Sequence, residues 1–331
     1  MEMRRFGNSD FSVSVIGFGA WAIGGPAMAG AVPLGWGNAD DAVSRRALQR
    51  ARELGINFFD TADFYGLGHS EELIGSVFGN RDDVLIATKV GHRLQPDQSV
   101  VLDFSKKHIL AACEQSLRRL RRGSIDHYQL HSVKLSHLEQ GECLEAMERL
   151  RSSGKIRSWG VSLNTFRPEV EAAYLIERGL GDGFQLVLNA INQRAVPLLE
   201  KAAAHGYGII ARMPLQFGLL TGKFSRETRF PADDHRSLRL KPEVLSRALD
   251  GLEELVWPLA DKYCVSRTSL SLSFAASFRE VSTAIPGIRT VEQAEADTGG
   301  IVQLSAGDMA FIGDLYRRRF SAVVDLMQQA G

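Results

Sequence analysis

Four ionisable side chains stand at or just after the ends of three short strand-like segments in the first half of the chain. Asp60 ends the first segment, and Tyr65 follows in the loop behind it. Lys89 ends the second segment and His131 ends the third. A tyrosine hydroxyl is a weak proton donor at neutral pH, and a nearby ammonium group makes it a stronger one. This set of residue types therefore indicates proton transfer, with the carboxylate holding the ammonium group in its charged form.

The elements that must bring these side chains together are short strands that lead into helices. Residues 56–59 and 84–88 are largely apolar and rich in strand formers, residues 127–130 form a further apparent strand, and Ser70 opens a helical stretch after the first of them. In a closed parallel barrel the C-terminal ends of all strands face one mouth, where active sites are assembled. Taken alone, Asp60 also fits a loop-capping carboxylate and Tyr65 a packing aromatic residue. The repetition at three successive strands favours a site.

Eight such strands alternate with helices along the chain. They are expected at residues 13–19, 56–59, 84–88, 127–130, 156–161, 184–188, 208–211 and 281–285. Because no strand pair after Gly17 is expected to be joined by a tight hairpin, parallel pairing through crossover helices follows. A doubly wound open sheet is the competing fold, but residues 17–22 lack the last glycine of its GxGxxG opening. We expect a (β/α)8 barrel that forms a single domain over residues 1–331.

Several segments lie outside this alternation. Residues 4–11 have a turn-forming centre and predict an N-terminal β-hairpin. Residues 20–38 and 92–105 are expected to be long loops over the barrel mouth. Helical patterns at residues 242–264, 266–278 and 307–328 predict extra helices near the C-terminus.

Composition excludes several classes of function. Lys plus Arg equals Asp plus Glu at 39 each, so no net field attracts a nucleic acid or an acidic membrane, and the arginines of residues 118–122 fit a solvated helix end. The 3 cysteines form no CxxC pair and the 8 histidines no HExxH spacing, so no metal site is expected. No apolar run approaches the ~20 residues of a membrane span. We therefore expect a cytoplasmic protein.

Six motifs, taken in order, are similar to those of the aldo-keto reductases. They are DTADFYG, GHSEELIG, ATKVG, YQLHS, GVSLN and IPGIRT, and the resemblance runs from about residue 17 to about residue 297. It implies a (β/α)8 barrel with a hairpin across its floor and NADP(H) as the cofactor. It also implies that Asp60, Tyr65, Lys89 and His131 form the catalytic set, with Tyr65 as the general acid.

The same resemblance implies a series of cofactor contacts along the second half of the chain. Those expected for the nicotinamide end are Ser162, Asn164 and Gln185, those for the pyrophosphate are Met213, Pro214, Leu215, Gly218, Leu219, Thr221 and Lys223, and those for the adenosine end are Gly287, Arg289, Gln293 and Asp297. Asn164 matches when Leu163 is treated as an insertion, and Leu188 replaces an aromatic residue of the family. Arg289 offers a planar fork for a 2′-phosphate, although a surface cation is the alternative.

The expected substrate is a small carbonyl compound: an aldehyde, a ketone or a keto-sugar. Trp21, Phe64 and His92 are the expected substrate contacts, with Trp36 and Phe217 as further candidates, and each aromatic residue also fits simple loop packing. Two other functions stay open. One is an aldose dehydrogenase that uses the same site in the oxidative direction, and the other is a redox-sensing module similar to the β-subunits of potassium channels. The sequence does not indicate an oligomeric state.

Overall fold

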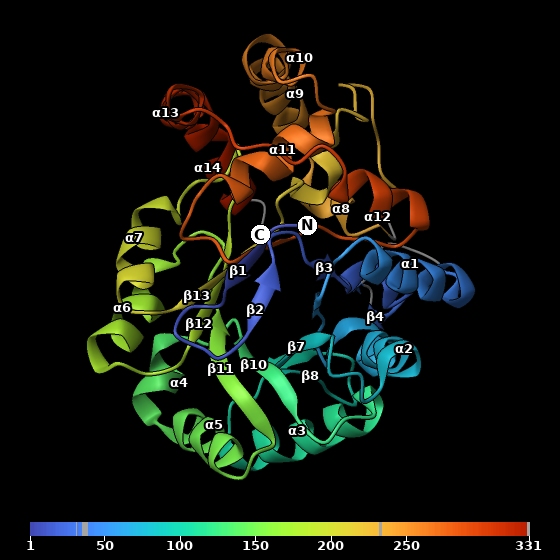
Figure 1. The fold of residues 1–331 in the computed structure, drawn as a ribbon, viewed down its shortest axis with the longest axis vertical. Helices are drawn as coiled ribbons and strands as arrows, with labels where there is room; N and C mark the ends of the chain where they lie inside the picture. Colours follow the sequence, from blue (N-terminus) through green and yellow to red (C-terminus); the bar gives the residue numbers. More distant parts are fainter. Residues whose placement is uncertain (31, 35–38, 232–233, 330–331) are drawn as a thin grey trace.

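Eight parallel strands form the centre of the molecule in a computed structural model that describes residues 1–30, 32–34, 39–231 and 234–329. The strands follow one another around the sheet in chain order, and helices surround them (Figure 1). The two edges of the sheet meet where Ile16 pairs with Ala284 and Gly19 with Gly287. Hydrogen bonds from Gly17 N to Ala284 O (2.8 Å) and from Gly19 N to Pro286 O (2.8 Å) close the barrel there. The expected barrel is confirmed.

The barrel strands are short and mostly buried on both faces. Their bounds are β3 (Phe18–Gly19), β6 (Phe58–Asp60), β7 (Leu85–Val90), β10 (Ile125–His131), β11 (Ile156–Ser162), β12 (Gly183–Val187), β13 (Gly208–Arg212) and β14 (Thr283–Ile285). Strands buried in this way read as continuous apolar runs, which is why the sequence locates them. Each run ends at the same rim of the barrel, so the residues that end the strands become neighbours.

A hairpin of β1 (Met3–Arg5) and β2 (Ser12–Ser14) lies across the opposite end of the barrel (Figure 1). Phe6 is fully buried there, in a cluster with strand residues such as Phe58. A Cβ atom at Gly208 would lie 2.7 Å from the Phe6 ring, so the floor depends on glycine at that position. The expectation of one strand over residues 13–19 is wrong, because its first part pairs with β1 while β3 pairs with β6.

The helices of the crossovers lie outside the barrel, and α12, α13 and α14 follow the last barrel strand. Their bounds are α1 (Asp41–Glu53), α2 (His69–Phe78), α3 (Lys106–Leu120), α4 (Leu135–Gln140), α5 (Glu142–Ser152), α6 (Glu169–Arg178), α7 (Val196–Ala204), α8 (Arg236–Arg239), α9 (Pro242–Gly251), α10 (Pro258–Lys262), α11 (Arg267–Ala276), α12 (Val291–Thr298), α13 (Ala306–Leu315) and α14 (Ser321–Gln329). Short π-helical turns at Leu252–Val256 and Tyr316–Phe320 interrupt two of the longer helices expected from sequence. Pro258 begins α10, since proline is tolerated at a helix start.

Two small antiparallel hairpins stand in loops that the sequence left without elements. One joins β4 (Met28–Ala29) to β5 (Val32–Pro33), and the other joins β8 (His92–Leu94) to β9 (Val100–Leu102). The expectation that no tight hairpin follows Gly17 is therefore wrong. These strands are two or three residues long and β9 is largely exposed, so they lack the apolar pattern that marks the barrel strands. Trp36 lies outside the described residues.

In the part of the chain that the structure describes, no helix combines the length and apolar character needed to cross a membrane.

Candidate active site

A large cavity of about 910 Å³ opens at the C-terminal ends of the barrel strands. Its wall includes Asp60, Tyr65 and His131, together with Ser162 and Gln185 from the next strands. The register explains this set, because His131 pairs with Ser162 and Ser162 with Gln185 on adjacent parallel strands. A cavity of this size is typical of sites that enclose a small molecule or cofactor.

Lys89 connects the carboxylate to the tyrosine from behind the cavity wall. Its side chain is fully buried, and its Nζ donates to Asp60 Oδ1 (2.6 Å) and to the Thr61 carbonyl (2.7 Å). Nζ also lies 3.2 Å from the Tyr65 hydroxyl oxygen. Burial lowers the pKa of Lys89, but the Asp60 carboxylate and the Tyr65 hydroxyl outweigh it, so the pKa of Lys89 is raised overall. Lys89 is therefore a charged ammonium group directed at the phenol oxygen.

Asp60 is held by two side-chain amides as well as by Lys89. Gln129 Nε2 donates to Asp60 Oδ2 at 3.0 Å and Gln185 Nε2 donates to the same atom at 2.8 Å. Because the carboxylate is only 2% exposed, these donors replace the water that would otherwise solvate it. Gln129 is a member of the site that sequence reasoning missed. It lies two residues before His131 on the inner face of β10, and strand alternation would have found it.

His131 stands on the other side of the phenol. Its ring lies edge-on to Tyr65 with centroids 5.9 Å apart, and its buried Nδ1 has no hydrogen-bond partner among the described residues. Burial lowers the pKa of His131 well below its ordinary value, and His92, Lys89 and Arg212 lower it further. His131 is thus a neutral imidazole, which has one N–H to donate and one lone pair to accept.

Aromatic rings line the mouth above Tyr65. Trp21 stacks near Tyr65 with ring centroids 6.2 Å apart, and Phe64 packs beside His92 at 5.3 Å. The His92 ring lies 4.4 Å from that of His131, and burial lowers the pKa of His92. Trp21, Phe64, His92 and Phe217 all belong to the cavity wall, so the structure brings these expected mouth residues together.

The cavity continues from this reaction end along β13 to the start of α12. Twelve of the fourteen expected cofactor contacts line it: Ser162, Asn164, Gln185, Met213, Pro214, Leu215, Gly218, Thr221, Lys223, Gly287, Arg289 and Gln293. Leu219 is fully buried and packs in the core, so the expectation that it contacts a cofactor finds no support in its position. Asn164 Oδ1 caps its own loop by accepting a hydrogen bond from Phe166 N at 2.9 Å. Gln185 Nε2 donates its hydrogen bond to Asp60.

Sequence reasoning also missed the cations of the cavity wall at Arg212, Arg236 and Arg239. Arg212 is the last residue of β13, at the position that Asp60 and His131 occupy on their own strands. A charged residue that ends an apolar strand was therefore a usable signal. Arg236 and Arg239 lie in α8, within the long segment between β13 and β14, and no local pattern connects that helix to the mouth.

Two cations line the far end of the cavity, and neither is bonded to an acidic side chain among the described residues. Arg289 and Lys223 line the wall there, and Arg289 is half-buried. Gln293 Oε1 accepts from the backbone N–H groups of Arg289 (2.8 Å) and Thr290 (3.2 Å), which fixes the turn that leads into α12. Positive side chains beside the start of a helix favour a bound phosphate group.

Asp297 is buried on α12, one helical turn beyond Gln293. It is 3% exposed, does not line the cavity, and its Oδ2 has no hydrogen-bond partner among the described residues. Burial raises the pKa of Asp297 from 3.8 to about 7, although the charge of Lys223 lowers it in part. A direct contact between Asp297 and the cofactor, as expected from the sequence, therefore requires the carboxyl group to become accessible. The charged form of this carboxyl group destabilises the folded state.

Replacing Asp297 with Asn should stabilise the protein at high pH but not at low pH. The raised pKa means that the folded state keeps a proton which the unfolded state releases, so the wild-type chain loses stability as pH rises from about 4 to about 7. The loss reaches at most on the order of 4 kcal/mol. Urea denaturation of both proteins across this range tests the prediction. A difference between them that does not change with pH would contradict it.

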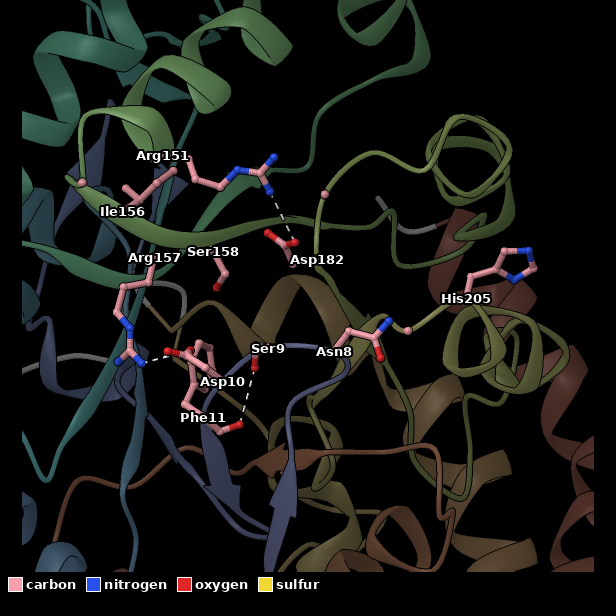
Figure 2. Close-up of a pocket in the computed structure, with 13 residues that line it drawn as sticks. Asn8, Ser9, Asp10, Phe11, Arg151, Ile156, Arg157, Ser158, Asp182 and His205 are labelled. Carbon is pink, nitrogen blue, oxygen red and sulfur yellow. Dashed lines mark hydrogen bonds and ion pairs between the residues drawn. The ribbon is translucent and has the colours of Figure 1, made fainter.

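A second cavity, of about 520 Å³, lies at the N-terminal ends of β11, β12 and β13 beside the floor hairpin. Figure 2 shows its charged residues bonded to one another, Arg157 to Asp10 and Arg151 to Asp182. Arg157 also donates to Asp126 (2.7 Å). Both arginines of this cavity are therefore paired with carboxylates of the protein itself.

Among the described residues, no group of three or more His, Cys, Asp or Glu side chains is arranged to hold a metal ion.

Comparisons with known proteins identify the family. Residues 15–317 match the model of the Aldo/keto reductase family. The chain is 32% identical over 298 residues to the uncharacterized oxidoreductase YqkF of Bacillus subtilis, covering 88% of this chain and 89% of that protein. Among solved structures, it is similar to the holo form of the aldo-keto reductase AKR11C1 from Bacillus halodurans, with a TM-score of 0.77, 26% identity and coverage of 95% and 96% of the two chains. The glycerol dehydrogenase AKR11B4 from Gluconobacter oxydans also has a TM-score of 0.77, with 30% identity and coverage of 96% and 95%. The chain belongs to the aldo/keto reductase family, whose general activity is the interconversion of carbonyl compounds and alcohols with a nicotinamide cofactor.

Proposed function

We propose that this protein reduces the carbonyl group of an aldehyde, ketone or keto-sugar to an alcohol with NADPH. The observation that carries the proposal is the bridging position of Lys89, whose Nζ contacts both Asp60 (2.6 Å) and the Tyr65 hydroxyl (3.2 Å). A cavity long enough to reach from this point to Arg289 supports it.

Tyr65, Lys89 and His131 have different roles in the proposed reduction. When bound, the reduced cofactor supplies a hydride to the carbonyl carbon. Tyr65 donates a proton to the carbonyl oxygen, and the Lys89 ammonium group stabilises the negative charge that develops on the phenol oxygen. His131, as a neutral imidazole, donates a hydrogen bond that orients the carbonyl oxygen. In the oxidative direction Tyr65 accepts the proton instead.

Ser162, Asn164 and Gln185 are proposed to face the carboxamide of the nicotinamide. All three line the cavity beside Tyr65, and the amide nitrogen of Gln185 is already bonded to Asp60 at 2.8 Å. Gln185 therefore offers its carbonyl oxygen as an acceptor, while Ser162 and Asn164 retain donors. Trp21, Phe64 and His92 are proposed to contact the substrate, because they line the cavity together with Tyr65 and His131.

NADPH oxidation with a panel of aldehydes, ketones and keto-sugars tests the proposal. Turnover with several members is the expected result, since the mouth is wide and partly aromatic. Oxidation of bound NADPH once per protein molecule, with no further turnover, would contradict the proposal and indicate a redox-sensing module instead.

Replacing Arg289 with Ala should weaken NADPH binding far more than NADH binding. The Arg289 guanidinium is the proposed contact of the 2′-phosphate, which only NADPH carries, and a charged pair of this kind contributes about 1.5 to 3 kcal/mol. Fluorescence titration with each cofactor measures both dissociation constants. Equal weakening for the two cofactors would refute recognition of the 2′-phosphate by Arg289.

A second candidate function is oxidation of a sugar or polyol at the same site. The similarity to a glycerol dehydrogenase at 30% identity favours this direction over a purely reductive role. Comparison of kcat/KM for NADP⁺ with polyols and aldoses against kcat/KM for NADPH with the matching carbonyl compounds distinguishes the two.

A further inference from the structure

Arg212 places a positive charge at the reaction end of the cavity. It ends β13, and its side chain lines the same wall as Tyr65 and His131. Burial lowers the pKa of His131, and the positive charge of Arg212 is among the groups that lower it further. Burial also lowers the pKa of Arg212, while Tyr65 and Asp60 raise it in part. The guanidinium group is therefore near the atoms that take part in proton transfer.

Among the residues that the structure describes, no acidic side chain forms an ion pair with Arg212. Its Nη2 donates to the Leu163 carbonyl (3.1 Å) and to Thr165 Oγ1 (3.0 Å), and its Nη1 lies 3.3 Å from the sulfur of Met213. Its Nε is buried and has no hydrogen-bond partner among the residues that the structure describes. None of these neighbours carries a negative charge, and a partly buried cation without an anion is unusual.

The other charged groups that the barrel strands place at this end of the cavity already balance one another. Lys89 and Asp60 form a buried ion pair at 2.6 Å, and Asp60 is the only acidic residue that lines the cavity among the described residues. His131 is held neutral by burial, which keeps its pKa low. A guanidinium group stays protonated even when burial lowers its pKa. At the mouth, Arg236 is paired with Asp234, whereas Arg239 is a further cation of the cavity wall. The reaction end therefore has a net positive charge, and Arg212 is the cation that a barrel strand contributes to it.

We propose that Arg212 makes the cavity bind the uncharged, reduced nicotinamide ring more tightly than the positively charged, oxidised ring. This inference rests on the proposed function, which requires the ring close to Tyr65 and therefore close to Arg212. The two redox forms share the same adenosine and phosphate groups and differ in the charge of the ring. Repulsion between Arg212 and the oxidised ring acts on that difference alone.

The expected consequence is a redox-dependent affinity that a single side chain controls. Binding the reduced form more tightly raises the reduction potential of the bound cofactor, because the oxidised form is the destabilised member of the couple. Arg212 is thus a residue that tunes the cofactor, and it takes no part in the transfer of the proton.

The test is the ratio of the dissociation constants for NADP⁺ and NADPH, measured without substrate by fluorescence titration for NADPH and by calorimetry for NADP⁺. Arg212→Gln removes the charge and keeps a polar side-chain amide. We expect this substitution to lower the ratio by about tenfold, which corresponds to about 1.4 kcal/mol. In potential, a tenfold change equals about 30 mV for a two-electron couple.

Three control variants separate charge from structure. Arg212→Lys keeps the charge and should keep most of the ratio. Thr165→Val removes one acceptor of Arg212 without changing any charge, and it should leave the ratio unchanged. Arg289→Ala removes a cation at the far end of the cavity, and it should weaken the binding of NADP⁺ and of NADPH by the same factor.

The outcomes distinguish the inference from the function on which it rests. The inference is wrong if Arg212→Gln changes the affinities for NADP⁺ and NADPH by the same factor. It is also wrong if Arg212→Lys lowers the ratio of the dissociation constants as much as Arg212→Gln does. If the wild-type protein binds neither NADP⁺ nor NADPH, the proposed function itself fails. Circular dichroism spectra identical to that of the wild-type chain establish that each variant is folded.

Discussion

Replacing Tyr65 with Phe should reduce kcat for NADPH-dependent carbonyl reduction by about 10²- to 10⁴-fold, the range typical of a lost general acid. The substitution removes the hydroxyl that lies 3.2 Å from Lys89 Nζ but keeps the ring that packs beside Trp21 and His131. Because the pocket keeps its shape, the dissociation constant of NADPH should not change. Steady-state kinetics and fluorescence titration measure the two quantities.

Tyr128 provides a matched control for this substitution. It is a fully buried tyrosine of β10 that does not line the cavity, and its hydroxyl has no hydrogen-bond partner among the described residues. Tyr128→Phe removes the same chemical group from a position outside the site, so it should keep kcat. If Tyr65→Phe keeps kcat as well, Tyr65 is not the acid.

Replacing Lys89 with Met should abolish turnover and also destabilise the fold by about 3 to 5 kcal/mol, as when one partner of a buried ion pair is removed. Asp60 would keep its charge at 2% exposure, with the amides of Gln129 and Gln185 as its remaining donors. Chemical denaturation measures the free energy of unfolding, and NADPH oxidation measures turnover.

The double variant Asp60→Asn with Lys89→Met separates the two effects. It removes both charges, so most of the lost stability should return, since no buried charge is left unpaired. Turnover should stay lost because the ammonium group that assists Tyr65 is absent. Recovery of turnover together with stability would show that Lys89 has only a structural role.

Much of the barrel and of its reaction end was predictable because both depend on short-range patterns. Buried parallel strands read as apolar runs, and Asp60, Lys89 and His131 each interrupt or end such a run at the same rim. Parallel register then brings these residues together without any knowledge of the loops.

The parts that sequence reasoning missed depend on contacts between distant segments. The small hairpin of β4 and β5 is built from strands of only two residues each, and α8 reaches the mouth through a long insertion. The role of Gln129 arises from a side-chain bond to Asp60, sixty-nine residues earlier in the chain. Arg212 was within reach of the rule that located His131, but its missing counter-ion is visible only in three dimensions.

The most direct test of the account is a crystal structure of the protein with bound NADP⁺. We predict that the nicotinamide ring lies between Tyr65 and Arg212. Space for one carbonyl group should remain between the ring and the Tyr65 hydroxyl, so that the carbonyl carbon can approach the reactive ring carbon to a near-attack separation of about 3 to 3.5 Å. The same structure should place the adenosine phosphate against Arg289. A nicotinamide ring bound away from Tyr65, or a cofactor held in the floor cavity beside Arg157, would contradict the account.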